Sequence, residues 1–173
     1  MTHAPTGRIT PRLLGALFER HAAALALFAR QWCDWPEDVV QQAFLSLASQ
    51  KHMPERPTCW LYTAVRNAAV SASRSAGRRR RREAAVAEAK DPWFIQSYES
   101  RLDSEAAVKA LRALPAEQRE VIVARIWGGL TFEHVGEVTG CSSSAAHRRY
   151  RAGMTALRER LGIQCLTNTT TER

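Results

Sequence analysis

The apolar residues of the first half of the chain recur at intervals of three and four, which is the spacing of a helix with one buried face. Thr10 and Pro11 precede the first such stretch, and a capping residue followed by a first-turn proline is a typical helix start. A loop with two prolines, at 51–58, separates the second stretch from the third. We therefore predict three helices: Pro11 to Trp32, Pro36 to about Gln50, and Trp60 into the arginine tract at 78–82.

The helical pattern is lost after the arginine tract and returns near residue 103. We interpret residues 83–102 as a linker, because Pro92 interrupts a stretch without a regular apolar repeat. Four helices are predicted beyond it: from Asp103 or Ser104 to Leu111, from Pro115 to the glycines at 128 and 129, from Thr131 to Val138, and from Ser142 to about Leu161. Because no segment alternates like a strand, the sequence predicts an all-α protein. It consists of two small helical domains, 10–82 and 103–162, joined by the linker and followed by a flexible tail at 163–173.

The stretch from 130 to 150 has the order of a helix-turn-helix, with Gly140 in the turn and Ser142 able to cap the second helix. A helix that enters the major groove of DNA needs small or polar residues at its start and basic residues on its exposed face. The second helix carries such residues, and we expect DNA contacts from Ser143, Ser144, His147, Arg148 and Arg151. An ordinary helical hairpin with a solvated arginine face is the alternative.

The net charge of the chain also favours a nucleic-acid partner. Its 173 residues include 25 Lys and Arg against 17 Asp and Glu, a net charge of +8. The lysines among them are Lys51, Lys90 and Lys109, so nearly all of the positive charge is guanidinium, which suits bidentate contacts with phosphates and bases. Nucleic acid is therefore the leading partner class, and the use of arginine for ordinary solubility is the alternative.

The sequence lacks the motifs typical of metal-binding proteins, enzymes and membrane proteins. The four cysteines stand far apart without a ligand-spaced histidine, so we expect no metal site, disulfide framework or cofactor. The sequence has no carboxylate pair, nucleophile–base pair or phosphate-binding glycine loop, and we do not expect an enzyme. No apolar run approaches the roughly 18 residues of a membrane span, and no signal peptide is evident. We expect a cytoplasmic protein without membrane insertion.

Two of the predicted helices in the first domain carry polar faces. On the second helix the face opposite the apolar stripe consists of Asp38, Gln41, Gln42 and Leu45. On the third helix one face consists of Asn67, Ser71, Arg74 and Arg78, and it leads into the arginine tract. The latter can follow a phosphate backbone while its polar groups touch bases, and a solvated surface is the alternative for both faces. Tyr62 and Trp60 could stack on unpaired bases; we expect Trp60 in the core and leave Tyr62 open.

Three segments together resemble a known family. They are PEDVVQQAFL at 36–45, WLYTAVRN at 60–67, and LPAEQREV at 114–121, ahead of the helix-turn-helix. In this order they are similar to bacterial RNA polymerase sigma factors of the extracytoplasmic-function (ECF) group of the sigma-70 family. The resemblance covers about residues 10–82 and 103–162.

The resemblance implies roles for both domains. Residues 10–82 would be sigma region 2, with Asp38, Gln41 and Gln42 docked on the clamp helices of core RNA polymerase. Arg66, Asn67, Ser71 and Arg74, with the 51–58 loop, would lie against the melted minus-ten strand of promoter DNA. Residues 103–162 would be sigma region 4, with Ser144, His147, Arg148 and Arg151 nearest the minus-thirty-five element. The protein would bind polymerase, recognise the promoter and promote melting, and an anti-sigma factor is a further candidate partner.

The family pattern is not matched at every exposed position. Gln42 stands where an acidic residue is usual and Ser71 where aspartate is common, so the promoter sequence does not follow from the resemblance.

Two other classes of protein fit parts of the sequence. One is a helix-turn-helix regulator that binds duplex DNA without polymerase. The other is an RNA-binding or nucleoid-type protein that uses the tract at 78–82 for nonspecific backbone contacts.

Overall fold

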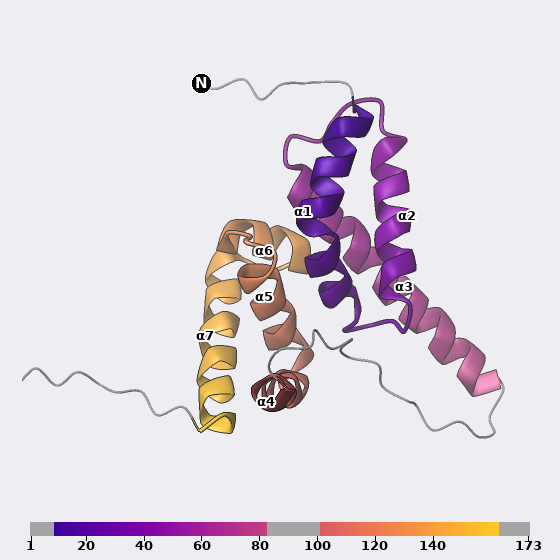
Figure 1. Cartoon of the computed structure of the whole chain (residues 1–173). Helices are drawn as coiled ribbons and strands as arrows, with labels where there is room; N and C mark the ends of the chain where they lie inside the picture. Colours follow the sequence, from indigo (N-terminus) through magenta and orange to yellow (C-terminus); the bar gives the residue numbers. More distant parts are fainter. Residues whose placement is uncertain (1–8, 83–100, 163–173) are drawn as a thin grey trace, which may run out of the picture.

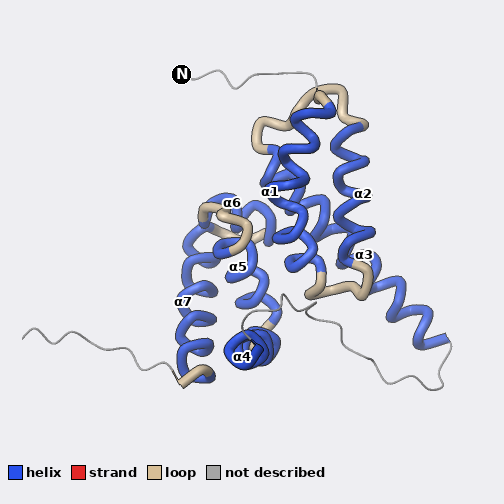
Figure 2. Tube along the Cα trace, in the orientation of Figure 1, coloured by secondary structure: helices blue, strands red, loops and turns tan. Residues whose placement is uncertain are grey.

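The computed structural model describes residues 9–82 and 101–162, and within these ranges it contains helices and no strand (Figures 1 and 2). The helices are α1 (Pro11–Ala29), α2 (Pro36–Ala48), α3 (Pro57–Arg82), α4 (Arg101–Arg112), α5 (Ala116–Ile126), α6 (Phe132–Thr139) and α7 (Ser143–Arg160). The all-α prediction is confirmed. Of the predicted linker at 83–102, residues 83–100 lie outside the described residues, as does the predicted tail at 163–173, whereas Arg101 and Leu102 belong to α4 and not to a linker.

Helices α1, α2 and α3 make up the first of the two predicted domains and pack on one another pairwise (Figure 1). Thr10 caps α1 as expected, because its hydroxyl oxygen accepts a hydrogen bond from the Leu13 amide at 3.3 Å. The side chains of the α2 stripe are buried against α1 and α3, and they are Val40, Phe44 and Leu47. The last turns of α3 extend beyond the bundle, so the predicted polar face of α3 continues away from the body of the protein (Figure 1).

Helices α4 to α7 make up the second predicted domain, with α5 at its centre. Val121, Ile122, Val123 and Ala124 have no exposed surface, although four consecutive helical residues point in all directions around the axis. Helix α7 approaches α5 closely at Gly153, where a Cβ atom would lie 2.6 Å from Cδ1 of Ile122. Helices α6 and α7 cover two sides of α5, and the first domain covers a third.

The two domains pack directly against each other (Figure 1). Helix α3 contacts α6 and α1 contacts α5, and the buried residues of both domains form one continuous hydrophobic cluster. The periodicity of the sequence had given no information about this arrangement.

Two predicted helix starts were wrong. Helix α3 begins at Pro57 and not near Trp60, because proline is well suited to the first turn of a helix. Helix α4 begins at Arg101, so Asp103 and Ser104 lie within the helix and do not cap it. None of the described helices is both long enough and apolar enough to span a membrane.

Gly136 provides a test of the close packing in the helix-turn-helix. A Cβ atom there would lie 2.6 Å from the carbonyl oxygen of Cys141, whereas a Cβ atom on the exposed Gly15 of α1 would meet nothing within 4 Å. We expect Gly136→Ala to lower the free energy of unfolding by about 1–3 kcal/mol, because the turn must move. Gly15→Ala is the control and should raise it by about 0.5–1 kcal/mol through helix propensity. Urea unfolding followed by circular dichroism measures both, and a stabilising Gly136→Ala would contradict the close approach.

Candidate protein and nucleic-acid interfaces

The polar face expected on α2 is present on the surface. All four of its residues are exposed, namely Asp38, Gln41, Gln42 and Leu45. The exposed fraction of Leu45 is 55%, which is large for an apolar side chain. Next to them runs a mostly apolar groove between α1 and α2, lined among others by Phe18, Phe44 and Leu45. Exposed polar side chains beside an apolar groove have the composition of a protein-binding surface, with an apolar centre and a polar rim.

An ion pair fixes the orientation of α2 relative to α1. Nη2 of Arg30, just after α1, lies 2.7 Å from Oε1 of Glu37 in the first turn of α2. The hydrogen bond from Arg30 lowers the pKa of Glu37. Glu37 and Asp38 also place negative charge at the amino end of α2, where the helix dipole favours it.

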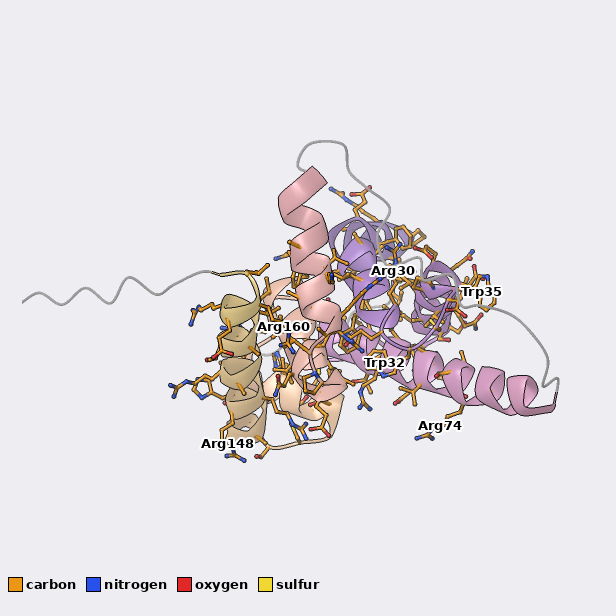
Figure 3. The ribbon with its side chains drawn as sticks, turned by 90° about the horizontal axis from the view of Figure 1, so that it is seen from below. Arg30, Trp32, Trp35, Arg74, Arg148 and Arg160 are labelled. Carbon is orange, nitrogen blue, oxygen red and sulfur yellow. The ribbon has the colours of Figure 1, made fainter. Side chains whose placement is uncertain are left out.

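The polar face of α3 is only partly available. Asn67, Ser71 and Arg74 are exposed, and the labelled Arg74 points away from the body of the protein (Figure 3). Arg78 belongs to α3, but its side chain lies outside the described residues. Arg66 is different, because its guanidinium is turned toward the second domain. The structure therefore brings three of the five predicted residues to one exposed surface.

Arg66 forms an ion pair across the domain boundary. Its Nε donates a hydrogen bond to Oε1 of Glu120 on α5, and its Nη2 lies 3.5 Å from Oε2 of the same carboxylate. Glu120 is only 5% exposed. Burial raises the pKa of Glu120, and the guanidinium of Arg66 opposes this shift. A buried carboxylate requires such a partner, because an unpaired charge away from water is strongly unfavourable.

The sequence analysis missed Glu120 as a residue of interest. It directly precedes the apolar residues 121–124, and no pattern in the sequence distinguishes it from a solvated acid. Its partner lies 54 positions away, so the pair becomes visible only in the folded chain.

Tyr62 is covered by the second domain. It has no exposed surface, and its ring packs edge-on against Phe28 with centroids 5.0 Å apart. A Cβ atom on Gly128, after α5, would lie 2.6 Å from the Tyr62 hydroxyl oxygen. Burial raises the pKa of Tyr62, and its hydroxyl has no hydrogen-bond partner within the described part of the chain. Trp60, which we expected in the core, is partly buried and packs against the hydrophobic core.

Three further contacts join the domains. Nη1 of Arg56 lies 2.6 Å from Oε1 of Glu137, and Sγ of Cys59 lies 3.4 Å from Oε2 of the same carboxylate. Nε of Arg119 lies 3.4 Å from Oε1 of Gln31. Burial between the domains raises the pKa of the Cys59 thiol to about 11.

The helix-turn-helix has the predicted geometry. The hydroxyl oxygens of Thr131 and Ser142 each accept a hydrogen bond of 3.2 Å from an amide in the first turn of the following helix. Gly140 ends α6 in the left-handed conformation, with φ of 71°. These features position α7 as the exposed second helix of the motif.

The predicted DNA-facing residues of α7 lie on its surface. Ser143, Ser144, His147, Arg148 and Arg151 are all exposed, and the labelled Arg148 projects from the body of the protein (Figure 3). The ring of Phe132 packs edge-on against His147, with centroids 4.9 Å apart, and so restrains that side chain. Arg149 faces elsewhere, because its Nη2 lies 2.8 Å from Oε2 of Glu117 on α5.

Comparisons with known proteins agree with this geometry. Residues 110–159 match the family model of sigma-70 region 4. The chain is 32% identical to the RNA polymerase sigma factor CarQ of Myxococcus xanthus over 157 residues, which are 84% of this chain and 87% of CarQ.

Two solved structures share the arrangement of helices. One is the sigma factor RpoE of Bartonella quintana, crystallised in complex with the anti-sigma factor NepR. It has a TM-score of 0.71 and 24% identity, over 90% of this chain and 99% of that one, and it supports the fold. The other is CnrH in complex with the cytosolic domain of CnrY, with a TM-score of 0.60 and 25% identity over 88% and 90% of the two chains.

Proposed function

Because this chain belongs to the sigma-70 family of RNA polymerase sigma factors, in the extracytoplasmic-function group, we propose that it binds core RNA polymerase, recognises promoter DNA and promotes melting. The observation that carries this proposal is the similarity to a sigma factor over 84% of the chain, which includes both domains. Sigma factors are transcription factors and not enzymes, so the protein would act by binding alone. It would work in the cytoplasm, where the polymerase is.

The proposal assigns polymerase binding to the exposed face of α2. Asp38 is the only carboxylate among the four residues of this face, and Gln41 and Gln42 offer neutral hydrogen-bonding groups. Leu45 and the adjacent groove supply apolar area that a partner can bury. Charge-assisted hydrogen bonds are about twice as strong as neutral ones, so Asp38 should contribute the largest single polar contact to basic clamp residues.

The proposal assigns promoter recognition to both domains. Residues 10–82 would be sigma region 2, in which Asn67, Ser71, Arg74 and Arg78, together with Arg66, lie along the minus-ten strand. Residues 103–162 would be sigma region 4, which places α7 in the major groove of the minus-thirty-five element. Because the protein would bind unpaired bases, it would stabilise the melted promoter relative to the duplex and shift the equilibrium toward the melted form. An anti-sigma factor is proposed as a further partner, since the structurally similar RpoE was crystallised with one.

Reconstituted transcription tests the proposed function. Tagged protein is purified with core RNA polymerase, and run-off transcription is then measured on a library of genomic fragments with and without the protein. The proposal requires stoichiometric polymerase binding and new start sites that share two upstream elements. A protein that shifts duplex DNA but does not bind polymerase would instead be a helix-turn-helix regulator.

Charge reversal at Asp38 tests the polymerase-binding face. We expect Asp38→Arg to weaken binding to core polymerase by about tenfold or more, equivalent to about 1.4 kcal/mol, because basic clamp residues would be repelled. Glu159→Arg makes the same charge change on an exposed residue at the far end of α7 and should bind normally. Fluorescence anisotropy of labelled protein titrated with polymerase measures both. Equal affinities for Asp38→Arg and the unaltered protein would refute the assignment.

Neutralising arginines on α7 tests recognition by the second domain. On promoters found by the library experiment, we expect Arg148→Ala and Arg151→Ala each to weaken holoenzyme binding by about 1–3 kcal/mol where the side chain contacts a base. Arg158→Ala removes the same charge from the other end of α7 and serves as the matched control. Promoter-binding isotherms at several salt concentrations separate base contacts from phosphate contacts. If all three variants behave alike, the exposed start of α7 does not read the promoter.

A further inference from the structure

We propose that Trp35 is an aromatic anchor of the polymerase-binding face, where its indole ring packs against a basic side chain of core RNA polymerase. This inference rests on the proposed function, and it adds a contact that the resemblance to sigma factors does not assign. It follows from the exposure of Trp35, from its place on α2, and from the charges around it.

The fold leaves the indole ring of Trp35 in solvent. Its exposed fraction of 62% is the largest among the exposed large hydrophobic side chains of the described residues. Trp32, three positions earlier, is used differently. Its ring packs edge-on against Phe28, with centroids 5.1 Å apart, and the guanidinium of Arg66 lies 5.9 Å from its centroid. Trp35 makes no such ring contact in the part of the chain that the structure describes, so a partner can bury its large apolar area.

Trp35 extends the exposed face of α2 by one turn. Its carbonyl oxygen accepts a hydrogen bond from the amide of Val39 at 3.4 Å, so the residue is continuous with the helix. Residues three, four or seven positions apart lie on one side of a helix, which places Trp35 in line with Asp38 and, farther along, with Leu45. At 1.5 Å per residue this line is about 15 Å long, and it has an apolar side chain at each end. Figure 3 shows the labelled Trp35 at the outer edge of the first domain, on the side remote from α7.

This position suits an anchor of a protein interface. Tryptophan is enriched among the few residues that dominate the binding energy of protein complexes, and such residues are fully covered by the partner. A partner docked on Asp38 and Leu45 would lie along the same side of α2 as Trp35. The ring is therefore within reach of the partner that the proposed function already requires.

The charges around Trp35 favour a basic protein partner over DNA. Asp34, Glu37 and Asp38 lie within three positions of it in the sequence. Arg30 pairs with Glu37, whereas Asp38 is exposed and forms no ion pair with any described residue. Phosphates would be repelled by these carboxylates. A basic side chain would be attracted, because it can lie over the indole ring and donate a hydrogen bond to the carboxylate of Asp38.

Truncation of Trp35 tests the anchor. We expect Trp35→Ala to weaken binding to core polymerase by about tenfold or more, because truncation of an aromatic anchor commonly has a large effect. Trp35→Phe keeps an aromatic ring and should retain most of the affinity. Trp127→Ala is the matched control, with the same change at a tryptophan after α5 that is 47% exposed, and should bind normally. Fluorescence anisotropy of labelled protein titrated with polymerase gives the affinities, and circular dichroism establishes that each variant is folded.

A double-mutant cycle tests whether Trp35 and Asp38 share one basic side chain of the polymerase. In an Asp38→Asn background we expect the loss of affinity caused by Trp35→Ala to be smaller by about threefold or more. The reason is that the carboxylate helps to hold the cation over the ring. Purely additive effects of the two substitutions would refute the shared basic side chain.

Single-stranded DNA separates a protein partner from a nucleic-acid partner. With a labelled oligonucleotide of random sequence, the free Trp35→Ala protein and the unaltered protein should bind with equal affinity. If the substitution weakens binding to the oligonucleotide and leaves binding to polymerase unchanged, Trp35 stacks on bases and the anchor is refuted.

The outcomes distinguish the anchor from the proposed function. If the unaltered protein binds polymerase and directs transcription, and Trp35→Ala binds equally well, the anchor is refuted and the sigma function stands. If the unaltered protein does not bind polymerase, the sigma function fails and the anchor fails with it.

Discussion

The packing of α5 is the constraint on which the rest of the structure depends. Its residues 121–124 are buried on every side, and a helix that is apolar all round needs neighbours all round. Helices α6 and α7 provide part of this cover, and α1 provides the remainder from the other domain. Because Glu120 directly precedes these residues, the same packing removes its carboxylate from water, and Arg66 supplies the charged partner that a buried carboxylate needs. The packing around α5 therefore also determines where the guanidinium of Arg66 lies.

Much of the fold could be predicted because its determinants are local. The caps at Thr10, Thr131 and Ser142 each use a side chain three positions from the amide it accepts from, and the turn at Gly140 needs a backbone that glycine adopts easily. The exposed faces of α2 and α7 follow from helical spacing alone. The predicted helix starts were less accurate where one residue fits two structures. Pro57 is typical both of the end of a loop and of the first turn of a helix, and in the structure it begins α3.

The contacts between the domains could not be predicted, because no local pattern contains them. Trp60 and Tyr62 are two positions apart and so face different sides of α3, and which of them is buried more fully depends on where the second domain packs. Arg66 resembled a DNA-contacting residue by its place in the WLYTAVRN segment. In the structure the same side chain is part of the contact between domains, which a family resemblance based on one domain at a time does not reveal.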